Sequence, residues 1–99
     1  MRSVDNSELC RLRGLAALDV LRLMAHHTKL DRDFVPRCAT GTRRVHVSAA
    51  GNEWELLVDG PRFFDTRSEQ GGGGAVDLVM HVWRVPFRKA VQMLRESGA

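Results

Sequence analysis

The sequence predicts an α+β domain in which an antiparallel three-stranded meander lies between an N-terminal helix and two short C-terminal helices. Three observations indicate this order of elements. Apolar residues recur at helical spacing in the first quarter of the chain, alternate with polar residues through the middle, and return to helical spacing after four consecutive glycines. A chain of 99 residues is long enough for one modest hydrophobic core. We therefore expect a single domain over residues 1–99, with residues 1–7 disordered.

The first helical segment lies between residues 8 and 27. Its apolar positions include Leu9, Leu12, Leu15 and Ala16. Gly14 weakens a helix interior by about 1 kcal/mol relative to alanine, and Asp19 is a good N-cap for the apolar run that follows it. Two descriptions remain open, namely one helix over 8–27 or two helices separated near Leu18 and Asp19.

The three strands follow a segment without periodicity. Residues 28–42 are expected to form a loop with a short extended piece near Phe34 and Val35. Alternation then predicts strands over 44–48, 54–59 and 62–66, joined by turns at Ala50-Gly51-Asn52 and Asp59-Gly60. Because side chains alternate between the faces of a strand, Phe63 and Phe64 should lie on opposite faces.

The last third of the chain predicts two short helices. One apolar stripe consists of Val76, Val79, Met80 and Trp83, and a second consists of Phe87, Ala90, Val91 and Leu94. Pro86 suits the first turn of the second helix, and Gly98 suits a cap just past its end. We expect both stripes to pack on the apolar face of the strands.

Composition excludes several classes of protein. No apolar run approaches the roughly 20 residues of a membrane span, and the N-terminus lacks the apolar segment of a secretion signal. We therefore expect a cytoplasmic protein with no membrane partner. The net charge of +3 and a pI near 9.5 permit binding to a polyanion without requiring it.

The residue patterns favour neither catalysis nor a metal site. Cys10 and Cys38 cannot supply a four-thiolate zinc site, and the four histidines lack the tight spacing of ligand pairs. No nucleophile motif is present, and the carboxylates near the glycines are interleaved with arginines, as on a solvated surface. We expect a non-enzyme without cofactor or metal.

Arginines and aromatic residues in the strand region predict a nucleic-acid surface. Arginines that follow a phosphate backbone beside rings that stack on bases are how single strands are bound. The candidate residues are Arg43, Arg44, His46, Trp54, Arg62, Phe64, Arg67, Arg84 and Arg88. The alternative is that Trp54 and one phenylalanine fill the core while the arginines only solubilise the surface.

The glycine run at 71–74 has two interpretations. It can be a joint between strand and helix that needs positive φ or close backbone approach. Alternatively, Gly72, Gly73 and Gly74 expose N–H groups at a helix N-terminus and bind phosphate. The Lys-Ser/Thr ending of a P-loop is missing.

The segments Gly73-Gly74-Ala75-Val76-Asp77-Leu78 and Phe87-Arg88-Lys89-Ala90-Val91 resemble the N-terminal zinc-ribbon domain of DnaG-type bacterial primases over residues 19–96. In that family the glycines follow a Cys-x-x-Cys pair of metal ligands, and this chain has Asp65 and Ser68 at those two positions. The resemblance implies that Cys38 is the remnant of the family's first ligand pair. The resemblance is to metal-free versions in primase-like and relaxase-associated proteins of plasmids and other mobile elements.

The resemblance implies a zinc-ribbon-like fold without metal that binds single-stranded DNA. The resulting hypothesis is a non-catalytic DNA-binding module, or an accessory protein of DNA replication or conjugation that contacts a replication or conjugation protein. The alternative is a protein–protein interaction adaptor or inhibitor that uses the same scaffold without binding DNA.

Overall fold

The computed structural model describes residues 5–32 and 41–99, and it is an α+β fold. The elements are α1 (Asn6–Arg13), α2 (Ala17–Met24), β1 (His27–Leu30), β2 (Arg43–Ala49), β3 (Asn52–Asp59), β4 (Arg62–Asp65), β5 (Gln70–Gly72), α3 (Ala75–Trp83) and α4 (Phe87–Ser97). The extended piece expected near Phe34 and Val35, and Cys38, lie outside the described residues.

The sheet has five antiparallel strands in the order β1-β2-β3-β4-β5, so the prediction of three strands is wrong in number. The expected antiparallel order of β2, β3 and β4 is present, with turns at Ala50-Gly51 and Gly60-Pro61, whereas the zinc-ribbon form of this meander stays a prediction. Strand β1 adds to the free edge of β2, and β5 adds to β4. Neither has a clear apolar alternation, because β1 is only four residues long and β5 consists of one glutamine and two glycines.

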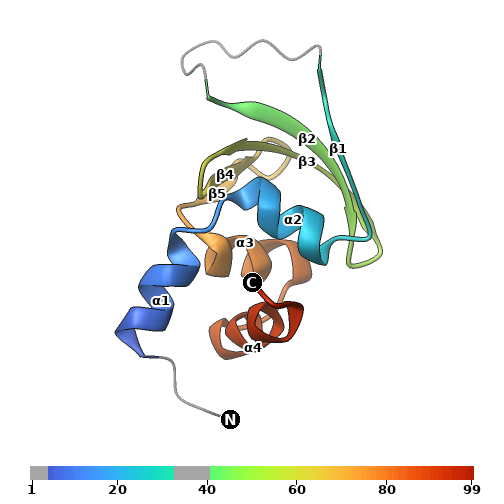
Figure 1. The fold of residues 1–99 in the computed structure, drawn as a ribbon. Helices are drawn as coiled ribbons and strands as arrows, with labels where there is room; N and C mark the ends of the chain where they lie inside the picture. The colour runs from blue at the N-terminus through green and yellow to red at the C-terminus, as the bar shows by residue number, and fades with distance from the viewer. Residues whose placement is uncertain (1–4, 33–40) are drawn as a thin grey trace.

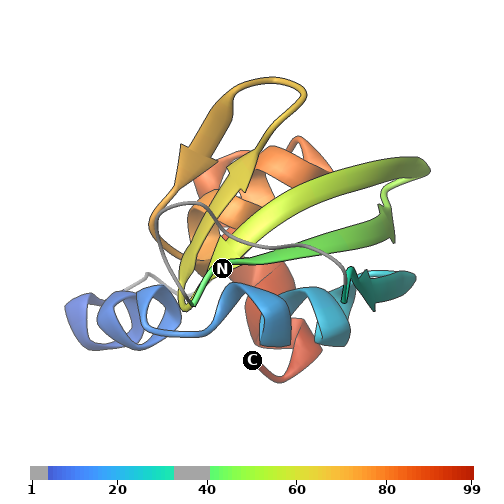
Figure 2. The same cartoon turned by 90° about the horizontal axis from the view of Figure 1, so that it is seen from above.

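Helices cover one face of the sheet (Figure 1). Helices α2 and α3 lie against this face, and α4 packs on α3 farther from the sheet. Figure 2 shows the sheet from above, with α1 (dark blue) at the side of the molecule opposite to the hairpin end of β2 and β3 (green). We call the covered side the inner face and the opposite side the outer face.

The core lies between the inner face and the helices. Strand residues Val45, Val47, Leu56, Val58 and Phe63 meet helix residues Leu12, Val20, Leu21, Leu78, Val79, Val82, Val91 and Leu94. In the first predicted helical stripe Val76 and Val79 are buried, and Met80 and Trp83 are partly buried against the core. The second stripe is buried except for Phe87, which is exposed in the first turn of α4. The alternation in β4 is confirmed, since Phe63 is 5% exposed and Phe64 is 42% exposed.

The N-terminal segment forms two helices, which confirms one of the two open descriptions. The break lies at Gly14 to Ala16 and not at Asp19, which sits inside α2. The Asp5 carboxylate accepts a hydrogen bond from the Glu8 N–H and caps α1. Residues 1–4 lie outside the described part, but this cap orders the chain from Asp5, so disorder over 5–7 was a wrong expectation. None of the described helices is long and apolar enough to cross a membrane.

Candidate nucleic-acid interface

The outer face of the sheet carries charges of both signs. Strand register places Lys29, Arg44 and Arg62 on it together with the carboxylates of Asp31, Glu53, Glu55 and Asp59. Arg44 donates to Asp31 from Nε at 2.9 Å and from Nη2 at 2.6 Å, and this hydrogen bond raises the pKa of the guanidinium. His46 Nε2 also lies 3.7 Å from Asp31 Oδ2. The expectation of an arginine-bearing, cationic sheet face is therefore corrected, because local carboxylates balance its cations.

The nine candidate residues do not form one surface. Four of them, Arg44, His46, Arg62 and Phe64, lie on the outer face. Three others, Trp54, Arg67 and Arg84, meet near the start of β3. Arg43 is exposed at the start of β2 in the inward-facing register, opposite Val58. Arg88 is exposed in the first turn of α4. Two separate hollows contain the residues that the structure brings together.

The first hollow, here the Trp54 groove, lies between the start of β3, the turn after β4 and the end of α3. Its volume is about 390 Å³, and it is lined by Asn52, Glu53, Trp54, Asp65, Arg67, Ser68 and Arg84. Trp54 is half-buried, and its indole N–H donates to the Ala49 carbonyl at 3.1 Å. The Arg84 guanidinium carbon lies 5.9 Å from the centre of the Trp54 ring, within range of a cation–π contact.

Arg67 and Arg84 keep their charge available in this groove. Arg67 Nη1 donates to the backbone carbonyl of Glu53 at 3.3 Å. The Glu53 carboxylate itself accepts from the Ser48 hydroxyl, at 2.6 and 2.8 Å. Within residues 5–32 and 41–99, neither arginine forms an ion pair with a carboxylate. Two guanidinium groups beside one indole can hold a phosphate next to a stacked ring.

The wall of the groove is fixed by a buried contact between Asp65 and His81. His81 Nε2 lies 2.7 Å from Asp65 Oδ2, and Asp65 Oδ1 accepts the Arg67 N–H at 3.1 Å. Burial alone would raise the pKa of Asp65, but the hydrogen bonds from His81, Ser68 and the backbone outweigh it and lower the pKa. The His81 ring also packs against Trp54, with centroids 5.7 Å apart, and against Phe63 at 5.6 Å.

Backbone strain gathers in the segments that form the groove. The non-glycine residues with positive φ in the described chain are Ala50, Glu69 and Arg84. They belong to the β2–β3 turn, the β4–β5 turn and the end of α3, which are the segments beside the groove. Such strain costs about 1 kcal/mol or more per residue and concentrates at functional sites.

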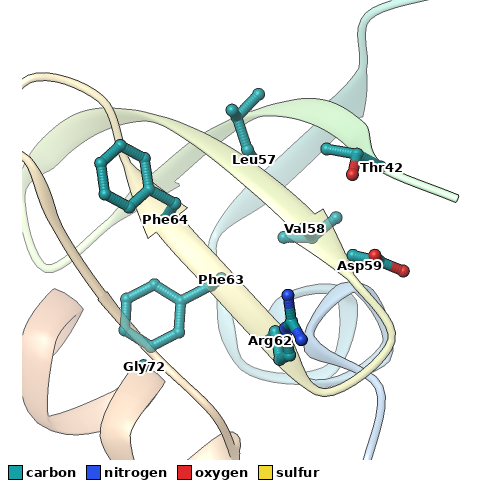
Figure 3. Close-up of a pocket in the computed structure, with 8 residues that line it drawn as sticks. All are labelled: Thr42, Leu57, Val58, Asp59, Arg62, Phe63, Phe64 and Gly72. Carbon is teal, nitrogen blue, oxygen red and sulfur yellow. The ribbon is translucent and has the colours of Figure 1, made fainter. Parts of the chain in front are cut away.

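The second hollow, here the Phe64 dish, lies on the outer face at the other end of β3. Its volume is about 330 Å³ (Figure 3), and its lining comprises Thr42, Leu57, Val58, Asp59, Arg62, Phe63, Phe64 and Gly72. Val58, Phe63 and Gly72 pair across the strands and form its floor, with the Phe63 ring turned to the inner side. Leu57 and Phe64 form one row across the strands, and Asp59 and Arg62 form the next row.

The glycine run serves as a joint with close backbone approach. A Cβ at Gly72 would lie 2.7 Å from the Cβ of Asp77, and one at Gly74 would lie 3.1 Å from the Cα of Arg13. Positive φ does not contribute, since no glycine of the run has it. Asp77 occupies the first turn of α3, where its charge already interacts with the helix N-terminus. This geometry does not support the phosphate site expected at Gly72, Gly73 and Gly74.

Two important residues were missed as site residues by the sequence interpretation. His81 and Asp31 carry no local motif, and their partners lie 16 and 13 positions away along the chain. No signal in one sequence reports such contacts. Among residues 5–32 and 41–99, no three His, Cys, Asp or Glu side chains are grouped so that they could hold a metal ion.

Comparison with known proteins gives no relative. No family model, curated protein or solved structure matches this chain.

Proposed function

We propose that this chain is a non-catalytic module that binds single-stranded DNA through the Trp54 groove. The observation that carries the proposal is the pair of arginines beside the half-buried indole of Trp54. Arg67 and Arg84 have no carboxylate partner within the part of the chain that the structure describes. Cations that contact phosphates and a ring that stacks on bases are the two elements of sequence-tolerant single-strand binding.

The biological setting proposed is that of an accessory protein in DNA replication or conjugation on a mobile element. It rests on the resemblance of the chain to primase zinc ribbons. In the proposed homology, Asp65 and Ser68 stand where that family has a ligand pair. Asp65 contacts His81 and accepts a hydrogen bond from the following turn. In this proposal these hydrogen bonds fix the turn in place, as a bound metal does in that family.

The second candidate function is a protein-interaction adaptor without DNA binding. The balanced charge of the outer face favours it, because four carboxylates beside three Lys or Arg side chains give this face no net attraction for a polyanion. An adaptor would bind its protein partner through the outer face, and the Trp54 groove would contact no ligand. The two candidates therefore differ in which surface a variant must disturb.

The deciding experiment is a fluorescence-anisotropy titration of a labelled dT 12-mer at low and rising salt. We expect the logarithm of the binding constant to fall linearly with the logarithm of the salt concentration. The magnitude of this slope should decrease by about 0.7 for each phosphate-contacting arginine that is removed. Arg67→Ala and Arg84→Gln should each weaken binding and reduce the slope. Arg11→Ala, an exposed position on α1, is the control with the same change in charge.

Stacking is tested separately with Trp54→Leu. Loss of a base–aromatic stack costs about 1–3 kcal/mol, which corresponds to a loss of affinity of about 5- to 150-fold. Absence of binding by the wild type at low salt would reject the DNA proposal and favour the adaptor. Binding that Arg67, Arg84 and Trp54 variants leave unchanged would move the site to another surface.

A further inference from the structure

The Phe64 dish contains two charged side chains, those of Asp59 and Arg62. In the described part of the chain, no ion pair or side-chain hydrogen bond joins Asp59 or Arg62 to another residue. They lie directly opposite each other on β3 and β4, beside the row of Leu57 and Phe64. The Asp59 carboxylate, an acceptor, and the Arg62 guanidinium, a donor, thus lie next to apolar side chains (Figure 3).

Phe64 presents an aromatic surface beside these groups. It is 42% exposed, one of the few large apolar side chains in the described chain that is so open. Its ring covers Gly71, where an added Cβ would lie 3.1 Å from Phe64 Cδ2. Because Gly71 and Gly72 have no side chains, neither residue separates the Phe64 ring from the edge of the sheet.

The spacing of the four side chains suits one planar, bicyclic ring. Neighbours across antiparallel strands have Cβ atoms about 5 Å apart, and residues two apart along a strand are separated by about 7 Å. Leu57, Phe64, Arg62 and Asp59 therefore mark the corners of a rectangle of about 5 by 7 Å. A ring that stacks on Phe64 brings its edges to Arg62 and Asp59.

We propose that the Phe64 dish binds one unstacked purine base of the bound strand and prefers guanine. This inference rests on the proposed function and adds base specificity to it. Arginine donates both N–H groups of its fork to guanine O6 and N7. A carboxylate accepts two adjacent hydrogen bonds from the guanine N1–H and N2 amino group. Adenine offers one donor beside one acceptor on that edge, and thymine offers a single N3–H donor between two carbonyl acceptors.

The dish and the Trp54 groove can serve the same strand. Trp54 and Asp59 are five residues apart on β3, about 17 Å along the strand, and their side chains leave the strand on opposite faces. An oligonucleotide of 12 residues is long enough to reach both. The groove then supplies affinity for any sequence, and the dish adds discrimination at one nucleotide.

The test compares 12-mers of dT that contain one central dG, dA, dC, deoxyinosine or 7-deaza-dG. We expect the dG oligonucleotide to bind about 10-fold more tightly than dT alone, the gain of a good bidentate pair. Deoxyinosine, which lacks the N2 amino group, and 7-deaza-dG, which lacks N7, should each lose part of this gain.

The variants separate this proposal from the proposed function. Asp59→Asn should abolish the difference in affinity between the dG and deoxyinosine oligonucleotides. Arg62→Gln should abolish the difference in affinity between the dG and 7-deaza-dG oligonucleotides. Phe64→Ala should abolish most of the preference for dG. All three should reduce the affinity for the dG oligonucleotide more than the affinity for dT. Arg84→Gln should weaken every oligonucleotide equally and keep the preference.

Titration with dGMP and dAMP, followed by amide NMR shifts of Thr42, Gly71 and Gly72, tests the dish even if no strand binds. Selective dGMP shifts at these residues support the proposal. Equal affinity for all bases in the wild type, or no selective dGMP shift, would overturn it. Strand binding without base preference would reject the dish and leave the Trp54 groove intact.

Discussion

His81 Nε2 and Asp65 Oδ2 lie 2.7 Å apart and join helix α3 to the last residue of β4. The side chains are only 9% and 4% exposed, so water does not compete strongly for this contact. The same carboxylate accepts the backbone N–H of Arg67, whose guanidinium lines the Trp54 groove. One buried carboxylate therefore fixes both the packing of the turn on α3 and the start of the groove wall.

Asp65→Asn should destabilise the fold. Hydrogen bonds to a charged group contribute about 1.5–3 kcal/mol each when removal leaves a buried partner unsatisfied. We therefore expect a loss of about 2 kcal/mol in the free energy of unfolding at pH 7, measured by urea denaturation. Glu69→Gln is the control on an exposed carboxylate outside the helices and should change stability by less than about 0.5 kcal/mol. Equal effects of the two variants would contradict the role of Asp65.

Asp65 should also shape the acid denaturation of the protein. Its pKa is lower in the folded state than in the unfolded chain, where a carboxyl titrates near about 3.9. The folded state thus binds its proton less readily, and the contribution is complete above that pH and is lost as pH falls through the folded pKa. Stability of the wild type should fall more steeply below about pH 4 than that of Asp65→Asn. Parallel pH profiles would show that another carboxyl dominates.

The adjacent phenylalanines of β4 should differ strongly in their contribution to stability. Phe63 is buried against His81 and the core, and its replacement by alanine should cost about 3–5 kcal/mol. Phe64→Ala should cost less than about 1 kcal/mol because its ring is on the outer face. Thermal and urea unfolding of the two variants measure the difference. Similar costs would mean that a partner or another segment buries Phe64.

The alternation that separates these two residues shows why the central strands could be predicted from the sequence. Val45, Val47, Leu56 and Val58 follow a period of two, and each lies on the inner face as that period requires. The helical stripes of α3 and α4 were predictable for the same reason. Strands β1 and β5 were not, because their formation depends on pairing with an existing edge and not on their own apolar pattern.

The candidate site was predictable only as a set of residue types. Trp54, Arg67 and Arg84 come from three elements, and their convergence depends on how α3 ends beside the sheet. The same holds for Arg44, whose pairing with Asp31 requires strand β1 that the sequence did not indicate. Tertiary contacts decided which arginines keep their charge available and which are neutralised.

The contact between Glu8 and Arg95 should couple the two ends of the described chain. Arg95 Nε donates to Glu8 Oε2 at 2.9 Å, a second N–H of the guanidinium bonds Oε1, and the two residues lie 87 positions apart. In a double-mutant cycle of Glu8→Gln and Arg95→Ala, the combined effect on stability should be smaller than the sum of the single effects. The coupling should shrink in 1 M NaCl. Additive effects at low salt would show that the pair contributes nothing beyond packing.

Metal removal should leave the protein unchanged. Asp65 stands where the resemblance places a zinc ligand, but its carboxylate is engaged by His81 and by the turn. Serine, at position 68, is not among the side chains that hold structural zinc. Elemental analysis of the purified protein should find far less than one zinc ion per chain, and EDTA should not shift the Tm. Stoichiometric zinc that EDTA removes with loss of stability would reject the metal-free interpretation.

Gly72→Ala and Gly73→Ala should have opposite effects, although they change neighbouring residues in the same way. A Cβ at Gly72 would lie 2.7 Å from Phe63 Cε1 and 2.7 Å from Asp77 Cβ, so the core ring or helix α3 must move. Overpacking of this kind typically costs about 1–3 kcal/mol. A Cβ at Gly73 would have no atom within 4 Å, and its φ is not positive.

Gly73→Ala therefore adds no strain to the folded state and restricts the unfolded chain. Such a change stabilises a protein by about 0.4–1 kcal/mol. Urea denaturation of the two variants distinguishes a tightly packed joint from a flexible one, because a flexible joint would tolerate both changes equally. If Gly73→Ala instead weakened DNA binding without loss of stability, the amides of the glycine run would contact phosphate after all.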